Sequence, residues 1–209
     1  MLRPHNNLVL SDIALRVAPG EKLAICGASG SGKTSLIMTL LRMTDLHQGV
    51  ITIDGVDIAA LAGNDVPAKL NVIPREPFFM PGTVRFNLDP EGRVSDDAIE
   101  TALRRLLALA RALLMPSRIL VLDEATSSVD DKTEAIMQEV IDTEWRQRKV
   151  ISVLHRFAHI RWFDRVAVLS SGRLVECDTP QVLLGRPSAF RELYHAFNYI
   201  RGIVDGFIY

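Results

Sequence analysis

Cysteine and net charge are both scarce in this sequence, and each scarcity excludes a class of protein. Only two cysteines occur among 209 residues, Cys26 and Cys177, and they lie far apart in apolar, strand-like contexts. A disulfide scaffold is therefore excluded, a reducing compartment fits, and we expect both thiols to be small buried core residues. The formal net charge is −1, so bulk electrostatics give no reason to expect nucleic acid as a partner.

Long apolar runs are also missing. A membrane-spanning helix needs about 20 consecutive apolar residues, and the nearest candidate, LLALARALLM, is short and interrupted by Arg111. The first ten residues contain no apolar core of the kind found in signal peptides. We therefore expect no membrane span within this chain, although the chain could lie against a membrane.

What is present is the composition of a folded globular domain, with 48% hydrophobic and 23% charged residues. Short apolar runs rich in branched residues predict strands, and two of them are interrupted by the hairpin dipeptides Asp54-Gly55 and Ser171-Gly172. The predicted strands cover residues 8–10, 13–17, 22–26, 50–58, 71–74, 118–123, 149–155 and 165–177.

Helical segments alternate with these strands. Apolar spacing predicts helices at about 33–43, 131–147, 157–162, 180–185 and 189–197. The second of them has a predicted buried stripe of Ile136, Val140, Ile141 and Trp145. An early antiparallel patch followed by strand–helix alternation predicts an α/β core with an attached N-terminal β-layer.

One further helix is predicted over residues 95–115. Ser95 is a suitable N-cap, Asp96 and Asp97 suit the positive first turn, and Pro116 ends the helix. One apolar face continues through the whole segment. We therefore predict a single unbroken helix.

The stretch GASGSGKT lies between a predicted strand and a predicted helix and fits the spacing G-x-x-x-x-G-K-[ST]. Glycines let successive backbone N–H groups curl around phosphate oxygens, and the helix N-terminus adds partial positive charge. Lys33 would reach the terminal phosphates, and the Thr34 hydroxyl would coordinate Mg²⁺. The alternative is a glycine-rich turn with a solvated lysine, which the flanking segments disfavour.

The stretch ILVLDEATSSVD delivers Asp123 and Glu124 at the carboxyl end of a hydrophobic strand, where α/β sheets bind ligands. Asp123 could hold Mg²⁺ opposite Thr34, and Glu124 could orient or deprotonate an attacking water. A helix-capping turn is the alternative interpretation of this acidic pair. His155 ends another strand and could hydrogen-bond a γ-phosphate, although a lone histidine there is more often structural.

Taken together and in order, these motifs resemble the nucleotide-binding domain of an ATP-binding cassette (ABC) transporter, and most closely the second such domain of the C subfamily. GASGSGKTSL resembles the Walker A loop, and ILVLDEATSSVD resembles Walker B with the D-loop. The stretches PFFMPGTVRFNLDP and DRVAVLSSGRLVECDTPQVLL resemble those that follow the Q-loop and the H-loop histidine. The resemblance covers nearly the whole chain.

The resemblance implies a P-loop NTPase core of α/β class that binds ATP and Mg²⁺. It implies a pairing with a second nucleotide-binding domain and with the transmembrane domains of an exporter, at the cytoplasmic face of a membrane. It implies that Glu124 is the catalytic base, His155 the γ-phosphate sensor, Asp130 the D-loop aspartate, and Thr34 and Asp123 the metal ligands. The nucleotide-binding residues would be Gly27, Ser29, Gly30, Ser31, Gly32, Lys33, Thr34 and Ser35.

The whole chain is then expected to be a single nucleotide-binding domain. Its predicted parts are a β-layer with Walker A (1–60), a fused remnant of the helical lobe (95–115), the core from Walker B to the H-loop (117–178) and C-terminal helices (179–209).

Three positions depart from the family pattern. The signature loop and most of the helical lobe are absent, with the junction near Leu103 and Arg104 inside the predicted helix. Arg75 occupies the Q-loop position, where a glutamine is expected; its guanidinium could pair with a phosphate, pair with Glu124 or point into solvent. Leu2 stands where an aromatic residue would stack on adenine, which weakens base binding by about 1 kcal/mol or more.

These departures leave three interpretations open. The first is an exporter cassette whose hydrolysis needs a complete partner domain. The second is a degenerate, non-catalytic nucleotide-binding module, and the third is a fragment or mis-spliced gene product. A soluble cassette ATPase acting on DNA or ribosomes is disfavoured because heptads and a basic patch are missing.

Overall fold

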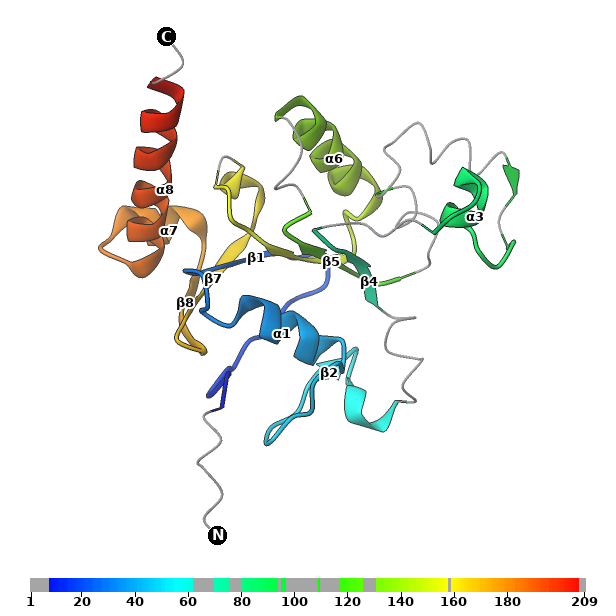
Figure 1. The fold of residues 1–209 in the computed structure, drawn as a ribbon. Coiled ribbons are helices and arrows are strands. Elements are labelled where there is room, and N and C mark those ends of the chain that lie inside the picture. Colours follow the sequence, from blue (N-terminus) through cyan, green and yellow to red (C-terminus); the bar gives the residue numbers. More distant parts are fainter. Residues whose placement is uncertain are drawn as a thin grey trace. The chain divides into compact units, whose positions relative to one another are not determined.

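The computed structural model describes residues 8–61, 70–75, 80–93, 95–96, 109, 117–125, 131–157 and 159–206. The chain forms two compact units, and each is described here by itself. The first comprises residues 1–17, 22–49 and 153–209, and the second comprises residues 18–21 and 50–152. Figure 1 shows the elements of both.

Three strands form the sheet of the first unit, in the order β1 (Lys22–Cys26), β7 (Arg165–Ser170) and β8 (Arg173–Asp178). β1 pairs with β7 in parallel, and β7 pairs with β8 in antiparallel fashion. Successive residues of β1 and β7 are buried on both faces, as expected for strands inside an α/β sheet. The predicted hairpin at Ser171-Gly172 is confirmed, since both residues have positive φ, 48° and 76°.

The helices of the first unit are α1 (Lys33–Leu40), α7 (Pro180–Gly185) and α8 (Ala189–Gly206), with a 3₁₀ turn η2 at Ile160–Trp162. α8 contacts β7, β8 and α7 (Figure 1). Glu176 of β8 holds its start, because the carboxylate accepts hydrogen bonds from the N–H groups of Ala189 (3.0 Å) and Phe190 (3.1 Å). Acceptors at these otherwise unpaired N–H groups stabilise a helix N-terminus.

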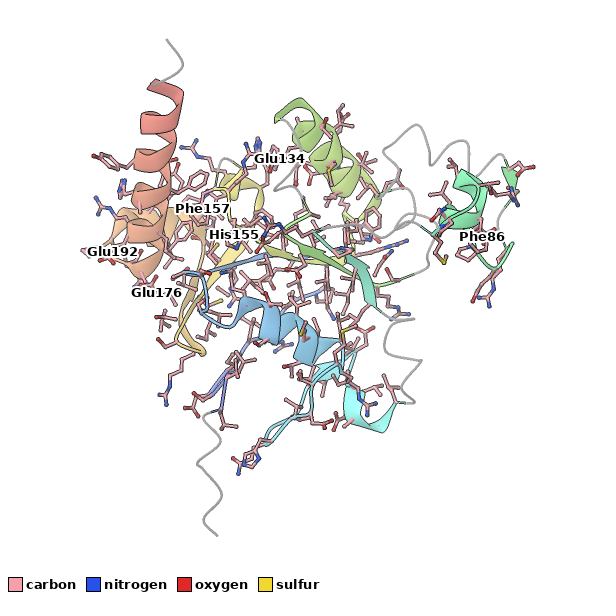
Figure 2. All side chains as sticks on the ribbon, viewed as in Figure 1. Phe86, Glu134, His155, Phe157, Glu176 and Glu192 are labelled. Carbon is pink, nitrogen blue, oxygen red and sulfur yellow. The ribbon has the colours of Figure 1, made fainter. Side chains whose placement is uncertain are left out.

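The core beneath α7 and α8 is aromatic. Phe157 makes edge contacts with Phe190 (5.7 Å between centroids) and Phe197 (5.4 Å), and lies 6.3 Å from Tyr194 (Figure 2). The same cluster includes Ala24 and Cys26 of β1 and Val166 and Val168 of β7. It therefore ties the C-terminal helix to the strand that precedes the glycine-rich loop.

The second unit contains β4 (Leu70–Ile73), β5 (Ile119–Asp123) and β6 (Lys149–Val153), side by side in that order. β4 and β5 are parallel, with Leu70 opposite Ile119 and Ile73 opposite Leu122. The other elements are α6 (Asp131–Glu144), a short helix α3 (Val84–Leu88), a 3₁₀ turn η1 (Ile58–Ala60) and the strands β2 (Thr52–Ile53) and β3 (Val56–Asp57). The predicted hairpin at Asp54-Gly55 is confirmed, with φ of 51° and 80° at the two turn residues.

Helix α6 and the core of the second unit correct one prediction. Met137, Val140, Ile141 and the following Trp145 are buried in one cluster with Leu120, Leu122 and Ile73. Ile136 is 49% exposed, so the predicted stripe was wrong at that residue. The buried face runs through positions 137, 140, 141 and 145, which follow the helical period, and position 136 lies off it.

The N-terminal β-layer is smaller than predicted. Residues 8–10 and 13–17 do not form strands, and the antiparallel hairpin that the structure describes before residue 60 is β2–β3. The N-terminal segment instead runs against two loops: Ser11 N–H donates to Gly172 O at 2.9 Å, and the Leu10 side chain lies against Gly32. Its backbone therefore contacts turns instead of a strand edge.

Helix boundaries also differ from prediction. α1 ends at Leu40, three residues early, because Arg42 has a φ of +56° and Met43 N–H donates to Met38 O, which closes the helix in a Schellman turn. The helix predicted over 157–162 is reduced to η2. The helix predicted over 95–115, with the Leu103–Arg104 junction, falls outside the described residues apart from Ser95, Asp96 and the fully buried Leu109.

Candidate functional site

The glycine-rich loop connects β1 to α1 in the first unit. Its first residue, Gly27, has a φ of 155°, and a Cβ there would lie 2.3 Å from Leu169 O and 2.5 Å from Ser31 Oγ. Gly32, with a φ of 102°, precedes the first helical residue, Lys33. A residue with a Cβ would clash with neighbouring atoms and would have a strained backbone at both positions. The sequence therefore needs glycine here to bend the chain from strand to helix.

Lys33 holds this loop closed from within. Its side chain is only 5% exposed, and Nζ donates to Gly27 O (2.8 Å) and Ala28 O (3.1 Å). Burial raises the pKa of the neighbouring Cys26 thiol far above its ordinary value, and the positive charge of Lys33 offsets this in part. Cys26 therefore stays a protonated, buried thiol, as predicted, whereas Cys177 is only partly buried; both are free of disulfide bonds.

Two features of the loop fit a phosphate group. Ser31 Oγ is buried without a hydrogen-bond partner, which is uncommon for a buried hydroxyl. At the start of α1, no side chain caps the helix, and its first turn contains no acidic residue. Ala28, Ser29, Gly30 and Thr34 are exposed. An anion could therefore meet free N–H groups, the helix dipole and the ammonium of Lys33 together.

His155 lies at the same edge of the first unit as the loop. Leu154 N–H donates to Ile25 O at 3.0 Å, two residues before Gly27. Phe157, two residues after His155, is anchored in the aromatic core beneath α8 (Figure 2). His155 itself is exposed. Sequence reasoning missed this anchoring role of Phe157; the signal was an aromatic residue two positions after the histidine.

The second unit carries the acidic residues. Asp123 is the last residue of β5, and Glu124 follows it with a φ of +52°, a left-handed conformation that is strained for a residue other than glycine. Arg75 follows the end of the parallel neighbour β4, with only Pro74 between them. Its Nη1 lies 3.0 Å from Glu124 Oε2. Of the three environments left open for Arg75, the structure has the ion pair with Glu124.

The predicted site residues thus fall into two groups. Gly27 to Ser35 and His155 belong to the first unit, and Arg75, Asp123 and Glu124 to the second. Asp130 lies outside the described residues, as does Leu2. Within the described part of the chain, no three His, Cys, Asp or Glu side chains cluster as a metal site. The shared Mg²⁺ of Thr34 and Asp123 stays a prediction.

Residues 10–106 match the ABC transporter family. The ABC transporter ecdL of Aspergillus rugulosus is 42% identical over 213 residues, which cover 88% of this chain and 14% of that protein. ATP-binding cassette sub-family C member 10 of Mus musculus is 39% identical, covering 91% of this chain and 15% of that protein. The metal resistance protein YCF1 of Saccharomyces cerevisiae is 36% identical, and the match covers 97% of this chain and 15% of that protein. The chain therefore spans only about one seventh of such curated relatives.

A solved structure shares the fold. A bacterial Atm1-family ABC exporter with ATP bound superposes with a TM-score of 0.86 and 27% sequence identity, covering 92% of this chain and 40% of that one. This likeness confirms the predicted α/β P-loop fold. Within the described residues, no helix is both long and apolar enough to cross a membrane. The chain belongs to the ABC transporter family.

Proposed function

We propose that this chain is a single nucleotide-binding domain of an ABC exporter and binds Mg·ATP. The observation that carries the proposal is the loop between β1 and α1, which combines the Lys33 ammonium, a helix start that no side chain caps and a buried Ser31 hydroxyl without a partner. The backbone of Gly27 to Gly32 and the hydroxyl of Ser35 would hold phosphate oxygens.

Each remaining residue would have one task. Lys33 would exchange its bonds to Gly27 O and Ala28 O for the terminal phosphates, Thr34 and Asp123 would coordinate Mg²⁺, and His155 would donate to the γ-phosphate. Glu124 would orient the attacking water. Mg²⁺, when bound, neutralises the charge that develops on the phosphoryl group. Asp130 would connect the site to a partner domain.

We further propose that the partners are a complete nucleotide-binding domain and the transmembrane domains of an exporter, at the cytoplasmic face of a membrane. The relatives named above, among them the ABC transporter ecdL, are many times longer than this chain. This chain has no signature loop, so two copies would not complete each other's sites. A pair in which a full cassette supplies its signature loop would restore the missing donor, whose loss costs a hundredfold or more in rate.

Calorimetry with Mg·ATP tests the proposed binding. Lys33→Met keeps most of the side-chain volume but removes the ammonium, and we expect Mg·ATP affinity to fall at least tenfold. Lys149→Met is the matched control, because Lys149 is also a mostly buried lysine but pairs with Asp54. Equal affinity in wild type and Lys33→Met, or no binding by wild type, would contradict the proposal.

The second candidate is a nucleotide-binding module that does not hydrolyse ATP. The ion pair between Arg75 and Glu124 favours it, because the carboxylate that would act on water is already engaged. ATP turnover with and without a complete cassette, beside a Glu124→Gln variant, separates the candidates. Turnover that this substitution abolishes supports hydrolysis, and equal background in both supports binding alone.

A further inference from the structure

Arg75 and Glu124 come from neighbouring parallel strands and meet at the edge where those strands end. Glu124 is well buried, with 13% of its side chain exposed, whereas the Arg75 side chain is 62% exposed. The guanidinium therefore covers the carboxylate from the solvent side. Because Arg75 Nη1 lies 3.0 Å from Glu124 Oε2, the guanidinium occupies one of the directions from which a water could approach that oxygen and competes with the water for it.

The backbone adds to this placement. The left-handed conformation of Glu124, with a φ of +52°, fixes the direction in which its side chain leaves the end of β5. On the other strand, Pro74 restricts the backbone between Ile73 and Arg75. Both side chains therefore start from constrained backbone positions, and the contact does not depend on two freely moving loops.

We propose that Arg75 is a positioning residue that withholds the Glu124 carboxylate and so slows the Mg·ATP turnover that depends on Glu124 by up to about fivefold. The part that concerns nucleotide rests on the proposed function. We call this contact a reversible lock. An ion pair with an exposed arginine changes the ratio of paired to unpaired Glu124 by about fivefold or less, so part of the carboxylate stays unpaired by Arg75. A change in a partner domain could therefore release it.

Chemical labelling of Glu124 in the absence of nucleotide tests the lock itself. A carbodiimide with an amine modifies accessible carboxylates, and peptide mass spectrometry measures the rate at Glu124. We expect Arg75→Gln to raise that rate about fivefold, and Arg75→Lys, which keeps the positive charge, to stay near wild type. Arg118→Gln is the matched control, because Arg118 is an exposed arginine paired with another carboxylate, Asp54, in the same unit. Equal rates at Glu124 in wild type and Arg75→Gln would overturn the proposal.

ATP turnover tests the consequence. Because a lock of about fivefold leaves part of the Glu124 carboxylates accessible, Glu124→Gln should lower the turnover of wild type, but by about fivefold less than it lowers the turnover of Arg75→Gln. Arg75→Gln should raise turnover about fivefold, and adding Glu124→Gln should remove the gain. No gain in Arg75→Gln, or a gain that survives in the double variant, would overturn the proposal. Failure of wild type to bind Mg·ATP in calorimetry would instead defeat the proposed function, while the labelling result would still decide whether Arg75 covers Glu124.

Discussion

At the scale of single residues, the loop after β1 depends on the absence of one side chain. A Cβ added at Gly27 would clash with the side chain of Ser31 and with the backbone carbonyl of Leu169, which cannot move without disturbing strand β7. Gly30 also has a positive φ, 75°, but a Cβ there would meet nothing within 4 Å. Substitutions at these two glycines therefore distinguish the effect of a steric clash from the effect of backbone strain alone.

We expect Gly27→Ala to lower the free energy of unfolding by about 3 kcal/mol or more, since it adds a clash to the backbone strain. Gly30→Ala should cost only about 1 kcal/mol, which is the strain of a left-handed residue. Urea denaturation of both variants measures the difference. Equal costs would mean that the loop relaxes around a new Cβ.

Asp54 is a residue whose role depends on its charge. It occupies the turn of the β2–β3 hairpin and accepts hydrogen bonds from Lys149 Nζ (3.1 Å) and Arg118 Nη1 (3.3 Å). The hydrogen bond from Lys149 is the main cause that lowers the pKa of Asp54; burial opposes it, and the charges of Lys149 and Arg118 add to the lowering. The turn is therefore tied to Arg118, which precedes β5, and to Lys149, the first residue of β6.

The lowered pKa makes the contribution of Asp54 to stability pH-dependent. Its folded-state pKa lies below the unfolded value of about 3.9, so the contribution is complete above that pH and declines as pH falls through the folded-state pKa. Asp54→Asn suits the same left-handed turn but carries no charge. We expect it to cost less than about 1 kcal/mol near neutral pH, because the pair is partly exposed. Denaturation at several pH values should show the difference shrinking below pH of about 4; a difference that does not change with pH would contradict this account.

At the scale of elements, α8 is connected to His155 through Phe157. The phenyl ring packs on Phe190 and Phe197 of α8, and only Arg156 separates Phe157 from His155. The long C-terminal helix therefore contributes to the position of a residue that it does not itself contain. Ala189, Leu193, Tyr194 and Phe197 of α8 pack against the same core.

We expect Phe157→Leu to cost about 1–2 kcal/mol of stability through lost aromatic packing. If His155 senses the γ-phosphate, the same substitution should lower the preference for ATP over ADP, measured as the ratio of the two affinities. Phe163→Leu is the matched control, because Phe163 is buried in the same core but lies eight residues from His155 in sequence. Equal loss of ATP preference in both variants would mean that general loosening, and not Phe157, is responsible.

At the scale of the whole molecule, each unit has its own core and its own tryptophan. Trp162 packs against the core of the first unit, and Trp145 is fully buried in that of the second. The proposed metal ligands are divided in the same way, with Thr34 in the first unit and Asp123 in the second. Variants that keep a single tryptophan, Trp145→Phe and Trp162→Phe, therefore report on the two units separately.

A ligand that binds only the folded chain stabilises it by about 2.7 kcal/mol at a hundredfold excess over its Kd. We expect Mg·ATP to raise the unfolding midpoint reported by both tryptophans, because Thr34 and Asp123 would both be ligands of the proposed Mg²⁺. With ATP and EDTA, the rise at Trp145 should disappear, while part of the rise at Trp162 remains through the phosphate loop. A rise at Trp145 that survives removal of the metal would contradict a role for Asp123 in holding it.

The sequence by itself determined the features that depend on neighbouring residues: the glycine-rich loop, the hairpins at Asp54-Gly55 and Ser171-Gly172, and the order of strands and helices that predicts an α/β P-loop fold. These follow from local backbone preferences and from the spacing of apolar residues. The tertiary structure decided what depends on residues distant in sequence. It pairs Arg75 with Glu124 across 49 positions, packs Phe157 under α8, exposes Ile136, and places residues 8–17 against turns and not in a sheet. A side chain's partner is chosen by the packing of whole elements, and no pattern within one segment contains that information.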